Sequence, residues 1–128
     1  MRGRYRRVIG MVSIPGDRRD RDIIEMGQLA GGIFDEIVFR ESPDGRGRPT
    51  GETNGLMSKG AMLAGVAAER VHRIVDEFEA VRATLRMGKP GDLLVIMPTS
   101  VAPVWQQILA FVPEPRPAPM LLRAAAHA

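Results

Sequence analysis

The sequence has no cysteine, one tryptophan and one tyrosine among its 128 residues. Without cysteine there are no disulfides and no thiolate metal sites, which favours a cytoplasmic location. So few aromatic side chains offer little for nucleobases to stack on, so we expect no nucleic-acid partner despite the four arginines among the first seven residues. No apolar run approaches the ~20 residues that cross a bilayer, and no signal-peptide pattern follows these arginines, so we expect no membrane partner either.

Lysine is nearly absent, because Lys59 and Lys89 are the only two, and almost all positive charge is therefore arginine. Arginine recognises carboxylates and phosphates in a bidentate manner better than lysine does. A genome rich in G and C would explain the same composition, and composition alone favours that simpler explanation. An apolar content of 45% and a charged content of 26% are typical of a globular domain.

The common catalytic motifs are missing as well. No Gly-x-x-x-x-Gly-Lys-Ser/Thr sequence is present, and no strand-turn reads Gly-x-Gly-x-x-Gly. His72 and His127 have no serine and aspartate companions in a recognisable pattern. We interpret His72 as a hydrogen-bonded histidine on a sheet surface, and we predict neither a catalytic residue nor a metal site in this chain.

The apolar pattern that is present predicts strands alternating with helices. The expected strands are 8–14, 36–40, 70–75 and 93–97, and the expected helices begin near 17–20, 52, 76 and 101. This order gives a three-layer α/β domain, in which a mainly parallel, Rossmann-like sheet of four or more strands carries helices on both faces. We assign residues 1–112 to this domain. Prolines 113, 115, 117 and 119 exclude regular structure, so 113–128 is predicted to be a mobile tail.

Helical spacing also predicts which side chains face the core and which residues cap the helices. Asp17 or Asp20 is expected to cap the first helix, and Asp76 the third. The inward-facing side chains are expected to be Ile23, Met26, Ala30, Ile33, Phe34, Leu56, Met57, Ala61, Met62, Leu63, Phe78, Val81, Leu85, Val101, Val104, Trp105, Ile108 and Leu109.

Two charged loops follow the first two predicted strands. The first, 14–22, carries three basic and three acidic side chains, and the second, 41–52, has three glycines and two prolines. Both should lie at the carboxyl edge of the sheet, where open α/β sheets bind ligands. Their balanced charge argues against a plain phosphate cradle and suits a ligand with several polar groups, or a docking surface. A solvated loop without a ligand is the alternative.

Several motifs, in order, resemble the C-terminal domain of the Mur ligase superfamily, over about residues 6–110. By this resemblance the chain lacks the first β-α unit of that domain and the central ATPase domain, with its P-loop and magnesium ligands. The motifs are Gly16-Asp17-Arg18-Arg19-Asp20, Phe34-Asp35-Glu36-Ile37-Val38, Arg40-Glu41, Arg46-Gly47-Arg48-Pro49, Gly51-Glu52, Asp76-Glu77 and Lys89-Pro90-Gly91-Asp92-Leu93.

The resemblance implies an ATP-dependent ligase that activates a carboxylate as an acyl phosphate, which an amine then attacks to form an amide bond. The chain would be its lid and substrate-binding portion, inactive alone, with an upstream ATPase domain or its separate chain as partner. ATP and Mg²⁺ would be bound mainly by that partner and not by this chain alone. The implied substrate- and nucleotide-binding residues are Asp17, Arg18, Arg19, Asp20, Arg40, Glu41, Asp44, Arg46, Arg48 and Glu52.

One departure from the family bears on the substrate. Where peptidoglycan ligases carry Asp-Asn-Pro-Arg, this sequence has Glu41-Ser42-Pro43-Asp44. This argues against a diaminopimelate-type substrate, whereas the guanidinium group of arginine would pair with Glu41 and Asp44. An acidic peptide is the other substrate that the resemblance implies.

A second hypothesis, of a different class, is a free-standing α/β binding or oligomerisation module without ligase activity. The sheet edge left open by the missing β-α unit would then favour pairing with a second copy in a homo-oligomer.

Overall fold

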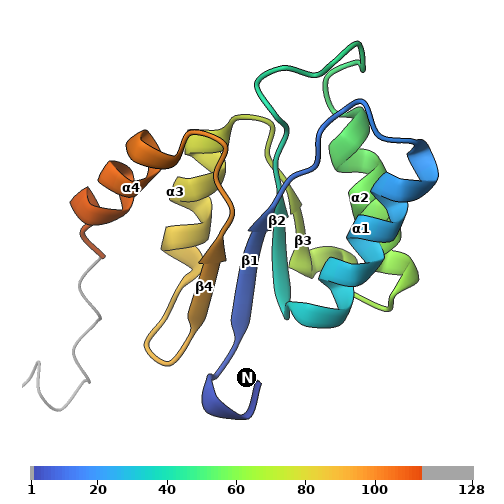
Figure 1. Cartoon of the computed structure of the whole chain (residues 1–128). Helices are drawn as coiled ribbons and strands as arrows, with labels where there is room; N and C mark the ends of the chain where they lie inside the picture. The colour runs from blue at the N-terminus through green and yellow to red at the C-terminus, as the bar shows by residue number, and fades with distance from the viewer. Residues whose placement is uncertain (1, 114–128) are drawn as a thin grey trace, which may run out of the picture.

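Four parallel strands form one sheet in the order β3-β2-β1-β4 (Figure 1). The computed structural model describes residues 2–113, so the predicted mobile tail lies, except for Pro113, outside the described residues. The parallel sheet confirms the α/β prediction, because two consecutive parallel strands must be joined by a crossover connection, usually a helix. The strands are β1 (Val8–Val12), β2 (Glu36–Phe39), β3 (Val71–Arg73) and β4 (Leu93–Ile96).

Helices cover both faces of the sheet, as predicted. Helices α1 and α2 lie on one face, and α3 and α4 on the other (Figure 1). None of the helices in the described part of the chain is long and apolar enough to span a bilayer. The helices are α1 (Asp20–Ile33), α2 (Glu52–Leu63), α3 (Glu77–Met87) and α4 (Val101–Ala110), with short 3-10 turns η1 (Arg2–Arg4) and η2 (Ala68–Arg70).

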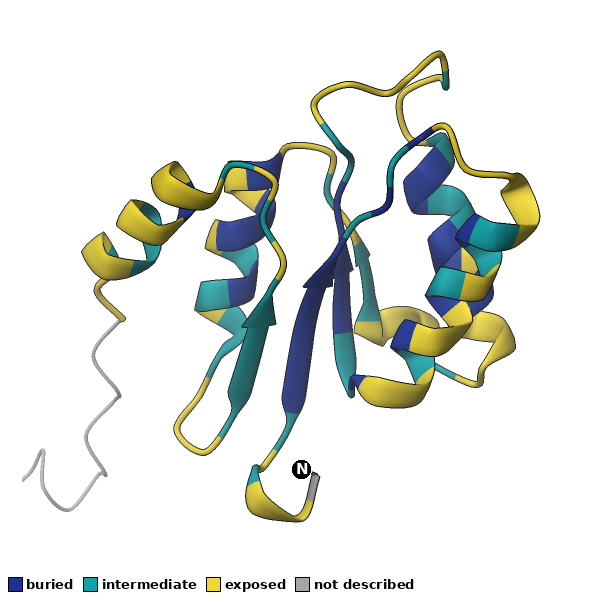
Figure 2. Cartoon of the chain, in the orientation of Figure 1, coloured by how far each residue is buried: buried dark blue, intermediate teal, exposed yellow. Residues whose placement is uncertain are grey.

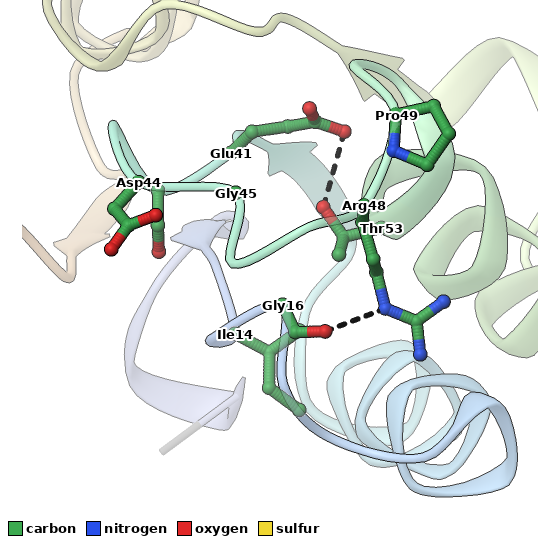
Figure 3. Close-up of a pocket in the computed structure, with 9 residues that line it drawn as sticks. Ile14, Gly16, Glu41, Asp44, Gly45, Arg48, Pro49 and Thr53 are labelled. Atoms are coloured by element: carbon green, nitrogen blue, oxygen red, sulfur yellow. Dashed lines mark hydrogen bonds between the residues drawn. The ribbon is translucent and has the colours of Figure 1, made fainter.

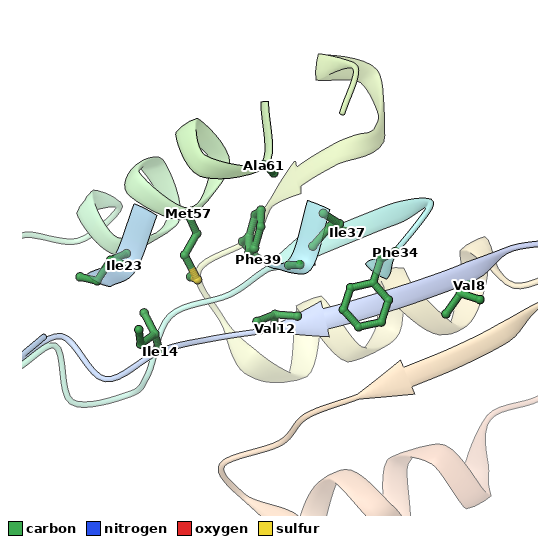
Figure 4. Close-up of a cluster of buried hydrophobic side chains, with 10 residues drawn as sticks. Val8, Val12, Ile14, Ile23, Phe34, Ile37, Phe39, Met57 and Ala61 are labelled. Atoms are coloured by element: carbon green, nitrogen blue, oxygen red, sulfur yellow. The ribbon is translucent and has the colours of Figure 1, made fainter. Parts of the chain in front are cut away.

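Two apolar cores lie on either side of β1, all of whose residues are buried (Figure 2). Val8 and Val12 point into the core beneath α1 and α2, together with Phe39 and Met57 (Figure 4). Met11 points into the other core, beneath α3 and α4. Because successive side chains of a strand point to opposite faces, a strand covered on both sides reads as a continuous apolar run.

Several predicted inward-facing side chains are exposed, because the buried stripes run along slightly different lines. In α1 the stripe passes through Ile23, Gly27 and Ala30 to Phe34, which turns Ile33 outward. In α3 it passes through Glu77, Ala80, Val81 and Thr84, and α4 buries only Val104. The exposed residues are Ile33, Met62, Leu63, Phe78, Val101, Trp105 and Leu109.

The predicted cap of α1 is also wrong. The helix begins at Asp20, and its N-cap is Arg19, whose side chain makes no capping hydrogen bond. Asp20 and Asp22 instead lie in the first turn, where their charges stabilise the positive end of the helix. The Asp76 cap of α3 is confirmed, because its carboxylate accepts the amide hydrogen of Glu79 at 2.9 Å. His72 is hydrogen-bonded to Glu36 at 3.0 Å, as predicted.

Asp92 fastens the amino-terminal arginines to the turn before β4. Its carboxylate is 1% exposed and accepts hydrogen bonds from Arg6 Nε at 3.0 Å, Arg7 Nη2 at 3.0 Å and the Lys89 amide at 3.0 Å. Burial raises the pKa of Asp92, but these hydrogen bonds and the positive charge of Arg7 outweigh it and lower the pKa from 3.8 to about 2.

We expect the stabilisation from Asp92 to disappear in acid. A carboxyl group with a depressed pKa in the folded state stabilises it fully above the unfolded pKa, and this stabilisation is lost as the pH falls through the folded value. The difference in free energy of unfolding between wild type and Asp92→Asn should therefore be complete at pH 7 and shrink between about pH 4 and pH 2. Urea denaturation across this range measures it, with exposed Glu25→Gln as the charge-matched control. A difference independent of pH would contradict the assignment.

Candidate substrate-binding edge

Arg48 joins the two charged loops at the carboxyl edge of the sheet. Its Nε donates to the Gly16 carbonyl at 2.6 Å (Figure 3). Its Nη2 donates to the Arg18 carbonyl, also at 2.6 Å. Its Nη1 forms ion pairs with Asp20 at 2.8 Å and with Glu52. The loops touch through their backbones, because a Cβ atom on Gly16 would lie 2.2 Å from the Gly45 carbonyl oxygen. The prediction that both loops share one edge is therefore confirmed.

Asp17 and Arg46 make a second link between the loops. Arg46 Nη1 donates to Asp17 Oδ2 at 2.7 Å, and this hydrogen bond lowers the pKa of Asp17. The Arg46 amide donates to Asp44 at 2.9 Å, and the φ of Arg46 is 52°, in the left-handed region that non-glycine residues seldom adopt. Both arginine links fasten the second loop over the first.

Arg18 and Arg19 form local ion pairs at the exposed surface. Arg18 bonds to Asp17 at 3.2 Å, and Arg19 bonds to Asp22 at 2.8 Å, which raises the pKa of Arg19. Their side chains are more than half exposed. They are therefore accessible to a partner that approaches this edge.

Glu41 caps α2, a role that the sequence did not predict. Its carboxylate accepts hydrogen bonds from the Gly51 amide at 2.8 Å, the Thr53 hydroxyl at 3.1 Å and the Asn54 amide at 3.1 Å (Figure 3 shows the contact with Thr53). The N-cap position itself is Gly51, which has no side chain to perform this role. The carboxylate of Glu41 is thus already paired within the chain.

Arg40 lies beneath the site, where it is 1% exposed. Its Nη2 donates to the Met97 carbonyl at 2.9 Å and lies 3.6 Å from Glu77 Oε2. Glu77 in turn accepts hydrogen bonds from the amides of Thr99 and Ser100, just before α4. Burial lowers the pKa of Arg40, against the influence of Glu77. Arg40 therefore positions the loop before α4 and does not reach the cleft.

A cleft of about 430 Å³ opens between the second loop and the start of α3. Of the predicted site residues, Glu41 and Arg48 line it, whereas Asp44 lines a smaller hollow beside it (Figure 3). The cleft also contains residues that were not predicted for the site. Some of them belong to the predicted loop 41–52, and the family motif Asp76-Glu77 was the sequence signal for the start of α3. The additional lining residues are Ser42, Pro43, Gly45, Thr50, Val75, Asp76, Glu77, Phe78 and Ser100.

The four α-helices all begin at this edge, and carboxylates of the chain itself lie at each beginning. Asp20 and Asp22 lie in the first turn of α1. Glu41 and Asp76 accept hydrogen bonds from amides in the first turns of α2 and α3. Glu77 accepts a hydrogen bond from the amide of Ser100, the residue just before α4. A phosphate site at a helix N-terminus needs free N–H groups and few carboxylates. The edge therefore does not suit a triphosphate, and no group of metal-binding side chains occurs in the described residues.

Comparison with known proteins gives both a sequence relationship and a fold. No family model matches the chain. The cyanophycin synthetase of Trichormus variabilis is 44% identical over 94 residues, which are 73% of this chain and 10% of that protein. The cyanophycin synthetase of Synechocystis sp. is 40% identical over 104 residues, which are 81% of this chain and 12% of that protein.

The solved structure of UDP-N-acetylmuramoyl-L-alanyl-D-glutamate–2,6-diaminopimelate ligase has a similar fold. It superposes with a TM-score of 0.59 at 23% identity, covering 70% of this chain and 18% of that chain. The chain therefore has the fold of part of this Mur ligase, in agreement with the predicted resemblance to the C-terminal domain of that superfamily. More particularly, it is a homologue of cyanophycin synthetase and spans about a tenth of the length of the curated relatives it matches.

Proposed function

We propose that this chain is the lid and substrate-binding portion of an ATP-dependent carboxylate–amine ligase of the cyanophycin synthetase type, and that it does not catalyse the reaction alone. The observation that carries the proposal is the carboxyl edge, where Arg48 fastens two loops into one wall beside an open cleft. Such a preformed wall suits a domain that closes over a site completed by another domain.

The nucleotide and metal belong, in this proposal, to the rest of the ligase. The helix N-termini at this edge are already neutralised by carboxylates, so the residues present do not fit a triphosphate with Mg²⁺. The partner is accordingly an ATPase domain, in the same polypeptide or in a separate chain. A cytoplasmic location stays a prediction from the composition.

The charges at the cleft favour an amino-acid substrate with a cationic side chain. Glu41 and Asp76 line the cleft, and their carboxylates accept hydrogen bonds from uncharged amide and hydroxyl donors, so they keep their negative charge, whereas Glu77 is buried against Arg40. The one arginine of the lining, Arg48, is ion-paired with Asp20 and Glu52, and Phe78 adds an aromatic face. Arginine fits this combination. The exposed Arg18 and Arg19 lie outside the cleft, where they suit an acidic peptide or the facing domain.

A chimeric ligase tests the proposal. The segment of Trichormus variabilis cyanophycin synthetase that matches this chain would be exchanged for it, and ATP-dependent incorporation of arginine into an acidic peptide measured. We expect the chimera to be active and the isolated chain not to hydrolyse ATP. A folded but inactive chimera, or ATP hydrolysis by the isolated chain, would contradict the proposal.

Within an active chimera, Asp44→Ala with Arg46→Ala tests the site assignment. Both side chains are exposed at the loop tip, and Arg46 has the unusual backbone conformation that functional sites often retain. We expect kcat/KM for arginine to fall about tenfold, equivalent to the loss of one charge-assisted hydrogen bond. Arg21→Ala is the exposed control on the first loop. Equal activity of the double variant and this control would remove these residues from the site.

A further inference from the structure

Helix α4 packs more loosely on the domain than the other helices do. It is the outermost element in Figure 1 and lies beside α3. Among its ten residues, all of which the structure describes, Val104 alone is buried, whereas Val101 and Trp105 are 65% and 56% exposed. An apolar groove of about 430 Å³ opens between α3, β4 and α4. Segments with so little buried apolar surface are the ones that open at low free energy in proteins.

Buried polar groups hold the segment that leads from β4 into α4. Arg40 Nη2 donates to the Met97 carbonyl at 2.9 Å, and Glu77 accepts hydrogen bonds from the amides of Thr99 and Ser100. Arg40 and Glu77 are themselves buried and lie 3.6 Å apart. The beginning of α4 is therefore fixed by an ion pair at the end of β2 and the start of α3.

The body of α4 is fastened by one side-chain hydrogen bond among the described residues. Gln107 Nε2 donates to the Phe78 carbonyl at 2.9 Å. Isolated helices shorter than about 12–15 residues are marginal in water, so α4 should lose its structure when it leaves α3. The core beneath α1 and α2 contains no residue of α4 and should stay intact.

We infer that residues 97–110 form a movable wall of the cleft, which opens when α4 leaves α3 and closes when Glu77 again binds the amides of Thr99 and Ser100. Ser100 lines the cleft together with Glu77 and Phe78, so departure of this segment widens the cleft. Movable segments that admit a substrate and then enclose it are common at enzyme sites. The movement is independent of the proposed ligase function, and only its use at the cleft rests on that function.

Single cysteines report the opening, because the chain has none of its own. Val104→Cys places a thiol at the buried position of α4, and Val12→Cys places one in the inner strand β1, where the valine is 2% exposed. Modification by a thiol reagent follows the population of open molecules. We expect the thiol of Val104→Cys to react about a hundredfold faster than that of Val12→Cys. Equal rates would overturn the inference.

A destabilised opposite face separates local opening from global unfolding. A Cβ atom on Gly60 would lie 1.9 Å from the Ile24 carbonyl oxygen, so Gly60→Ala forces α1 and α2 apart. It should speed modification of Val12→Cys about a hundredfold and leave the rate of Val104→Cys unchanged, because α4 opens without that face. Equal acceleration of both would show that α4 opens only in global unfolding. Hydrogen exchange of the unsubstituted chain is an independent check, since equal protection of the α4 and β1 amides would overturn the inference too.

Matched variants test the contacts that keep the wall closed. Gln107→Ala removes the hydrogen bond to α3 and should speed modification of Val104→Cys about fivefold, whereas Gln106→Ala, at an exposed neighbouring position, should have no effect. Glu77→Gln removes a charged acceptor and should speed it about tenfold, with the exposed Glu79→Gln as control. Unchanged rates in both Gln107→Ala and Glu77→Gln would refute this mode of attachment.

L-Arginine is the probe for the role of the wall at the cleft. A ligand that contacts the closed wall stabilises the closed state, so arginine should slow modification of Val104→Cys, compared with sodium chloride at the same ionic strength. An opening that arginine does not affect would refute the role at the cleft. Failure of the chimeric ligase, by contrast, would contradict the proposed function and would leave the opening of α4 as measured.

Discussion

Gly60→Ala should be among the most destabilising substitutions that add a single methyl group to this domain, lowering the free energy of unfolding by about 3 kcal/mol, the upper end of the usual range for overpacking. A Cβ atom on Gly60 would lie 1.9 Å from the Ile24 carbonyl oxygen, and one on Gly27 would lie 1.9 Å from that of Met57. Helices α1 and α2 thus contact each other through their backbones. No side-chain rotation can relieve such an overlap, so the helices must separate and open the core around Met57.

Gly55→Ala is the matched control, because it adds the same methyl group to the same helix. Nothing lies within 4 Å of the position that its Cβ would occupy. Alanine loses less backbone entropy on folding than glycine, so this variant should gain about 0.5–1 kcal/mol. Urea denaturation of the three proteins gives the comparison. A Gly60→Ala protein as stable as wild type would show that α1 and α2 do not approach as closely as described.

The sequence predicted those parts of the fold that depend on contacts near in sequence or on the sheet as a whole. Val8–Val12 is recognisable as a buried strand because both of its faces are covered, so no polar residue interrupts it. The meeting of the two charged loops follows from topology, since parallel strands bring their carboxyl ends to one edge. Asp76 was identifiable as a cap because its partner lies only three residues away.

The rest depended on contacts between distant residues. Glu41 caps a helix ten or more residues further along the chain, and no local rule connects it with the Asn54 amide. The apolar period that predicts a buried helix face treats Gly27 and Gly60 as neutral, although they decide how closely two helices pack. The same period placed Trp105 inward, because it cannot tell whether a neighbouring element covers that face.

The charged loops show how much of the candidate site could be predicted from the sequence. Their composition showed a balanced set of arginines and carboxylates but not how these pair. Most of the charge proves to be engaged within the chain, with Arg48 bound to both loops and Glu41 bound to α2. The residues that remain accessible, such as Arg46 and Asp44, are distinguished from these only by their burial and partners.

Glu77→Ala should have the second large effect, a loss of about 3 kcal/mol in the free energy of unfolding. Both Glu77 and Arg40 are buried, with side chains 3% and 1% exposed and 3.6 Å apart. Removing the carboxylate leaves the guanidinium of Arg40 without a countercharge and the amides of Thr99 and Ser100 without their acceptor. Loss of a buried charge's partner is costly because the remaining ion stays desolvated.

The pH dependence of the free energy of unfolding distinguishes the loss of the Glu77 charge from the loss of its side-chain packing. Burial raises the pKa of Glu77, but the amides of Ser100 and Thr99 and the charge of Arg40 together bring it below the usual 4.5. The stabilisation from Glu77 should therefore be complete above pH 4.5 and fade as the pH falls through the lowered value, so that Glu77→Ala and wild type converge in acid. Exposed Glu79→Ala, on the same helix, should resemble wild type throughout. An equal deficit of Glu77→Ala at neutral and acid pH would assign the loss to side-chain volume, and the buried ion pair would then contribute nothing to this fold.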